Sequence, residues 1–82
     1  MKGAFTMSER IIKLNDTKDA SRFVRAAEKC SYDVDLCYNS IVVDAKSILG
    51  VLGMDLTRKL TVRYHHEPDA EFDEALAEYA VS

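Results

Sequence analysis

The sequence of 82 residues has no apolar run close to the roughly 20 residues that a membrane-spanning helix needs. Its opening segment, MKGAFTMSER, also lacks the apolar stretch of a signal peptide. We therefore expect a cytoplasmic protein that has no contact with a membrane.

Basic residues are too few for a protein that binds nucleic acid through its phosphates. The chain has 11 Lys and Arg against 14 Asp and Glu, for a net charge of -3. Apolar residues make up 48% and charged residues 30%, which indicates a packed fold rather than disorder. The length allows one domain, over residues 1–82, with one small core.

Cysteine and histidine are also scarce. Cys30 and Cys37 do not form a CxxC motif, and no histidine pair is spaced around them as zinc ligands, so we expect reduced, half-buried thiols. His65 and His66 are adjacent on a predicted strand and point to opposite faces, which makes a shared metal difficult. Exposed polar residues at a strand end are favoured over a metal or proton-transfer role, and we expect no metal and no cofactor.

Alternating apolar residues predict four strands. Residues 5–14 suit the first, with an irregularity over residues 8–10. Residues 32–45 predict a hairpin whose turn lies at residues 39–40, and residues 59–66 predict the last strand.

Three helices are predicted between and after these strands. Residues 15–17 offer three candidate N-caps for an amphipathic helix that begins at about Thr17. Residues 48–52 form a short apolar helix, and Gly53 fits the left-handed conformation that often ends a helix. A last amphipathic helix begins near Asp69.

The predicted order is β-α-β-β-α-β-α, an α+β fold. Each strand has one polar side, and none is apolar enough for a parallel sheet that is buried on both faces. We therefore expect a four-stranded antiparallel sheet with three helices on one face.

The short helix carries more apolar surface than one face can bury. Successive residues of a helix are rotated by about 100° around its axis. On that basis we expect Leu49 and Leu52 to point inward, and Ile48 and Val51 to stay partly exposed.

The stretch DAKSILGVLGMDL, with an AKS triplet before a short apolar helix, resembles the HPr family, the histidine-containing phosphocarriers of the bacterial phosphoenolpyruvate-dependent sugar phosphotransferase system. The segment ASRFVRAAEK is similar to the first helix of that family, and the resemblance covers nearly the whole chain. It implies an open-faced β-sandwich in the cytoplasm. Such a protein docks on phosphotransferase-system or regulatory proteins through the start of the first helix and the apolar face of the second. We expect a monomer whose partner-binding residues are Lys18, Lys46, Ile48 and Val51.

The family motif, a histidine followed by Thr-Arg-Pro-Ala, is altered here. Asp16 stands at the position of the histidine, Thr17 matches, Lys18 replaces the arginine and Asp19 replaces the proline. Without an imidazole this site cannot carry a phosphohistidine. An acyl phosphate on Asp16 is chemically possible, but the two carboxylates oppose an incoming phosphate, and a capping role explains Asp16. We expect no catalytic residue and no enzyme activity.

Ser47 matches the serine that an ATP-dependent kinase phosphorylates in many Gram-positive members of the family. A serine before a helix also acts as a plain N-cap, and Asp44 would repel an added phosphate. Regulatory phosphorylation of Ser47 is therefore a hypothesis beside the capping role.

The main hypothesis is an HPr-like protein that is not a competent phosphohistidine carrier and acts as a regulatory or protein-binding module. One alternative is a phosphocarrier with an altered acceptor, Asp16 or Ser47. The other is an unrelated small-ligand-binding α+β domain that shares only the architecture.

Overall fold

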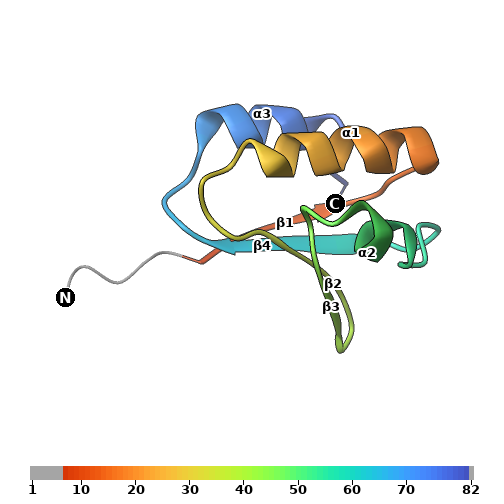
Figure 1. Ribbon diagram of the computed structural model, residues 1–82. Coiled ribbons are helices and arrows are strands. Elements are labelled where there is room, and N and C mark those ends of the chain that lie inside the picture. Colours follow the sequence, from red (N-terminus) through yellow and green to blue (C-terminus); the bar gives the residue numbers. More distant parts are fainter. Residues whose placement is uncertain (1–6, 82) are drawn as a thin grey trace.

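A computed structural model describes residues 7–81 of the chain (Figure 1). In chain order its elements are β1 (Met7–Ile12), α1 (Thr17–Glu28), β2 (Asp35–Tyr38), β3 (Ile41–Asp44), α2 (Ile48–Leu52), β4 (Leu60–His65) and α3 (Ala70–Ala77). The predicted order of strands and helices is confirmed.

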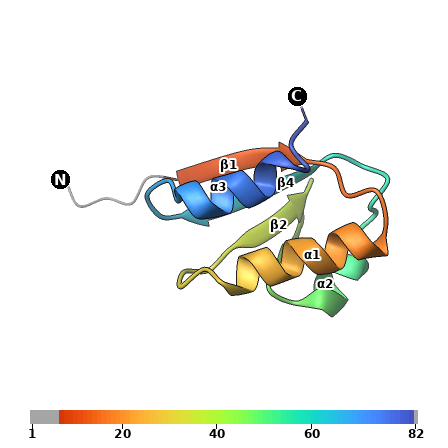
Figure 2. The same cartoon turned by 90° about the horizontal axis from the view of Figure 1, so that it is seen from above.

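The four strands form one antiparallel sheet in the order β1-β4-β2-β3. Figure 1 shows α1 and α3 side by side over one face of this sheet, and the view from above in Figure 2 places α2 beside α1. The predicted α+β fold, an open-faced sheet with helices on one face, is therefore confirmed.

The first strand is more regular than the sequence predicted. Its register with β4 runs without interruption from Met7 opposite His65 to Ile12 opposite Leu60, so the expected irregularity over residues 8–10 is wrong. The polar residues that suggested it have partners, since Ser8 Oγ donates to the carbonyl of His66 and Arg10 pairs with Asp73 of α3. Phe5, which was expected in this strand, lies outside the described residues.

The β2–β3 hairpin turns at Asn39 and Ser40, as predicted. Asn39 has a φ of 54°, the left-handed conformation that asparagine tolerates better than most residues. The turn joins Tyr38 directly to Ile41 across the hairpin and so sets the register of both strands.

The core lies between the sheet and the helices. Ile12, Leu36, Leu60 and Val62 come from the four-stranded sheet, and they meet apolar residues of all three helices. The helical members of this core are Ala20, Phe23, Val24, Ala27, Val51, Phe72 and Leu76. Within residues 7–81, no helix is long and apolar enough to cross a bilayer.

The short helix α2 faces the core differently from the prediction. Val51 is fully buried, whereas Leu49 is 81% exposed and Leu52 40% exposed, so the expected positions of these three residues are wrong. Only Ile48, which is 38% exposed, lies where it was expected. With apolar side chains at four of five positions, the sequence of α2 does not reveal which one points inward.

Gly53 ends α2 in a right-handed conformation, with a φ of -77°, and not in the left-handed one that was expected. Its backbone N–H donates to the carbonyls of Leu49 and Gly50, which closes the last turn of the helix.

Replacing Val51 by alanine tests the observed orientation of α2. We expect Val51→Ala to lower the free energy of unfolding by about 2 kcal/mol, because two buried methyl groups are lost and a cavity is left. Leu49→Ala, the matched control in the same helix, should change it by less than about 0.5 kcal/mol. Urea unfolding of both variants measures the difference, and a larger loss in Leu49→Ala would contradict this packing.

Candidate functional site

The start of α1 is closed by two carboxylates. Asp16 is the N-cap, in an extended conformation, and its Oδ1 accepts a hydrogen bond of 2.9 Å from the backbone N–H of Asp19. In return, Oδ2 of Asp19 accepts a bond of 3.1 Å from the N–H of Asn15. The capping role predicted for Asp16 is confirmed, and each side chain also holds the loop that leads from β1 into α1.

This arrangement stabilises the helix and places two carboxylates at its N-terminus. The N-terminus of a helix carries partial positive charge and free N–H groups, which is why anions bind there. Here the carboxylates of Asp16 and Asp19 already supply the negative charge. Thr17 and Lys18 are exposed in the same first turn, and Lys18 is the only cation among residues 16–19.

The start of α2 has a similar cap built from a neutral side chain. Ser47 is exposed and its Oγ accepts a hydrogen bond of 3.2 Å from the N–H of Gly50. Its own N–H donates to the carbonyl of Asp44 at 2.9 Å, and the Oδ1 of Asp44 accepts from the N–H of Lys46. The hydroxyl of Ser47 is thus accessible and lies at the positive end of a short helix, with a carboxylate three residues away in the chain.

Lys46 has a role inside the molecule that the sequence did not predict. Its Nζ donates a hydrogen bond of 2.9 Å to the carbonyl of Cys30, just beyond the last residue of α1. A cation at the C-terminal end of a helix is favourable because the carbonyls there carry partial negative charge. Lys18 lies at the other end of this helix of 12 residues, so the two lysines do not form one cluster.

The exposed side of α2 forms an apolar surface. We call the side chains of Ile48, Leu49 and Leu52, which are 38, 81 and 40% exposed, the α2 surface. Val51, which was expected to contact a partner, belongs to the core and is not accessible. Leu49, which was expected to be buried, is the most exposed apolar residue of the helix.

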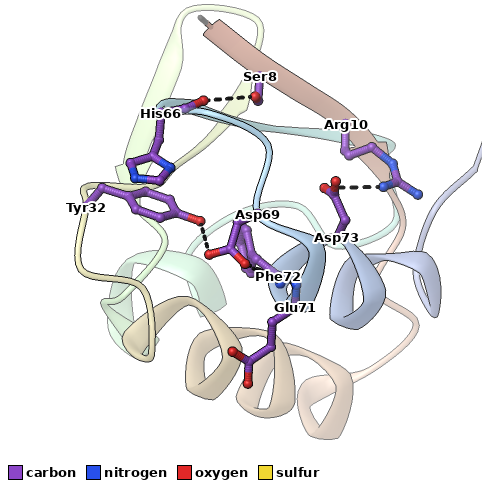
Figure 3. A network of polar contacts seen from close by, with 8 residues as sticks. All are labelled: Ser8, Arg10, Tyr32, His66, Asp69, Glu71, Phe72 and Asp73. Atoms are coloured by element: carbon purple, nitrogen blue, oxygen red, sulfur yellow. Dashed lines mark hydrogen bonds and ion pairs between the residues drawn. The ribbon is translucent and has the colours of Figure 1, made fainter. Parts of the chain in front are cut away.

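A second polar network lies at the other end of the molecule, around the start of α3 (Figure 3). Tyr32 donates from its hydroxyl to Oδ2 of Asp69 at 2.9 Å, and Oδ1 of Asp69 caps α3 by accepting from the N–H groups of Glu71 and Phe72. These bonds stabilise the charged carboxylate, and the one from Phe72 contributes most to lowering the pKa of Asp69.

His66 belongs to this network, although it was expected to be an exposed strand-end residue. Its ring stacks on Tyr32 with a centroid distance of 4.1 Å, and Tyr32 in turn stacks on Tyr64 at 5.0 Å. His65, the last residue of β4, is exposed as expected. The two histidines have separate environments.

Both cysteines are free and buried rather than half-buried. Burial is the main cause that raises the pKa of both thiols, so neither is prone to ionise. Within the described part of the chain, no group of three or more His, Cys, Asp or Glu side chains could hold a metal ion.

Comparison with known proteins gives one family and one fold. Residues 16–80 match the family model described as the PTS HPr component phosphorylation site. The chain is similar to the crystal structure of a phosphocarrier protein HPr from Bacillus anthracis str. Ames, with a TM-score of 0.71, 23% identity, and 93% of this chain and 99% of that one covered. The crystal structure of HPr-C-His from Thermoanaerobacter tengcongensis is also similar, with a TM-score of 0.63, 26% identity, and coverage of 89% and 88%. No curated protein matches the chain.

The cap on α1 can be tested by mutation. We expect Asp16→Ala to lower the free energy of unfolding by about 1 kcal/mol, because the N–H of Asp19 loses its partner. Asp16→Asn keeps an acceptor oxygen at the same place and should stay close to the wild type. Urea unfolding measures both, and equal losses in the two variants would contradict the capping role.

Proposed function

Because this chain belongs to the HPr family of the phosphotransferase system, we propose that it is a regulatory or protein-binding module that does not carry phosphohistidine. The observation that carries this proposal is the start of α1, where Asp16 and Asp19 occupy the cap and no imidazole is present. The two histidines of the chain are His65 and His66, at the end of β4. Family membership contradicts the alternative of an unrelated domain that shares only the architecture.

Chemistry at the start of α1 supports this proposal. A phosphohistidine forms when an imidazole nitrogen attacks phosphorus, and the side chains of residues 16–19 provide carboxylates, a hydroxyl and an ammonium instead. A phosphate that approached Asp16 would meet a second carboxylate, that of Asp19, with only Lys18 in the same turn to offset the repulsion. The alternative of an acyl phosphate on Asp16 is therefore disfavoured.

The docking part of the proposal rests on the α2 surface. Ile48, Leu49 and Leu52 together expose apolar area on one short helix, whereas Val51 is the residue of α2 that is buried in the core. Lys18 is exposed at the start of α1, and α1 and α2 are in contact. We propose that the α2 surface and Lys18 contact a partner protein in the cytoplasm. Val51 has no part in this contact.

Ser47 is the regulatory phosphorylation candidate within this proposal. Its hydroxyl is exposed and adjoins the α2 surface, so a phosphate there would place charge beside the apolar docking residues. That phosphate would meet the N–H of Gly50, which favours it, and the carboxylate of Asp44, which opposes it. Modification of Ser47 would act on docking, and it would not restore phosphate transfer.

Competition with a conventional HPr tests the proposed function. In this assay, phosphoenolpyruvate is the phosphate donor and a bacterial lysate supplies the proteins that phosphorylate a conventional HPr. A protein that docks on those partners without accepting phosphate should slow this phosphorylation. We expect excess wild-type chain to inhibit, and Leu49→Glu and Ile48→Glu to inhibit at least about tenfold less, because each places a charge in an apolar contact. Transfer is measured by the intact mass of the conventional HPr.

The matched control is Val81→Glu, which changes an exposed apolar residue outside the α2 surface and should inhibit like the wild type. Thermal unfolding checks that all three variants fold. If the wild type does not inhibit, or if Leu49→Glu inhibits equally well, the proposed docking through α2 is wrong.

A further inference from the structure

The face of the sheet that is turned away from the helices carries two parallel rows of side chains. Strand residues alternate between faces, and Ile12, Leu36 and Val62 point to the core, so their neighbours in the chain lie on the open face. In the part of the chain that the structure describes, no helix covers this face (Figure 1). We call it the open face.

One row is apolar. The strand register places Ile11, Thr61, Cys37 and Val42 next to one another across all four strands. Ile11 is 46% and Val42 54% exposed, while Cys37 is buried between its neighbours. With about 4.8 Å between adjacent strands, the row spans roughly 14 Å. It is long enough for two or three side chains of another protein.

The second row is charged and lies two residues further along each strand, at a distance of about 7 Å. It consists of Glu9, Arg63, Asp35 and Asp44. Arg63 is paired with Glu9, its Nε lying 2.9 Å from Oε2, so its charge is already matched. Asp35 and Asp44 face each other directly across the β2–β3 pair, and like charges in that position destabilise a sheet.

These two aspartates line a hollow of about 550 Å³. Asp33 contributes a third carboxylate, and Arg63 and His65 border the hollow on the side of β4. None of the ion pairs within residues 7–81 involves Asp33, Asp35 or Asp44. The hollow therefore has an excess of negative charge beside an exposed apolar row.

Charge decides which partner fits this surface. A second copy of the chain would bring the same carboxylates and a net charge of -3, so negative charge would meet negative charge. A nucleic acid is repelled for the same reason. We propose that the open face binds a segment of a partner protein that carries an apolar side chain and, about 7 Å from it, a Lys or Arg. The apolar side chain covers Val42 and Cys37, and the cation enters the hollow between Asp35 and Asp44.

This interaction goes beyond the proposed function, because it uses the side of the sheet opposite the helices. The α2 surface and the open face share no residue, so variants of one leave the other intact. The contact with the hollow is partly exposed, and salt should weaken it.

Selection from a random dodecapeptide library displayed on phage, with the wild-type protein as bait, tests the proposal. We expect the enriched peptides to combine an apolar residue with Lys or Arg. Their dissociation constants, measured by fluorescence anisotropy with synthetic copies, should rise about tenfold in the double variant Asp35→Asn with Asp44→Asn. Val42→Lys should weaken binding by a similar factor, and Leu49→Glu should leave it unchanged.

The double variant removes a repulsion between facing carboxylates, so thermal unfolding should show a stability equal to or above that of the wild type. Loss of binding then reflects lost charge and not lost folding. Any of the following peptide results would overturn the proposal: no enrichment, enriched peptides that bind the double variant as tightly as the wild type, or binding that Leu49→Glu abolishes. A dimer in sedimentation that Val42→Lys dissociates would also overturn it, since a second copy would then be the occupant.

Discussion

The apolar layer between one face of the sheet and the three helices is the contact on which the rest of the molecule depends. Leu36 and Val62 are paired on neighbouring strands, and they belong to the same buried cluster as Phe23 of α1. A helix as short as α2, with five residues, is not stable alone, so its position depends on its packing against the rest of the fold. Val51 is its buried side chain, and Leu49 is its most exposed apolar one.

The buried face was predictable from the sequence in elements where apolar residues recur with a clear period. It was not predictable in the short helix α2. The alternation in β4 and the three- and four-residue spacing in α1 each identify one buried face. In β2, Cys37 is buried although the alternation puts it on the polar side. In α2, apolar residues stand at four of five positions, so periodicity could not separate Leu49 from Val51. The contact of Lys46 with Cys30 and the stacking of His66 on Tyr32 join residues far apart in the chain. No local pattern predicts such contacts.

The candidate site was only partly predictable for the same reason. The cap formed by Asp16 is a local feature and is confirmed, because its partner is three residues away. Surface exposure depends on tertiary packing, and for that reason Leu49, and not the expected Val51, is the exposed residue. The family and its fold are shown by the comparisons. At the start of α1, the carboxylate of Asp16 is already engaged in a cap.

This chain has the fold of an HPr, and we propose that it does not carry phosphate at the start of α1. Intact mass and peptide mapping test it after incubation with phosphoenolpyruvate and a bacterial lysate, under conditions that preserve acid-labile phosphates. We expect this chain to stay unmodified while a conventional HPr in the same reaction gains a phosphate. A phosphate mapped to Asp16 would show instead that the capping carboxylate is a working phosphate acceptor.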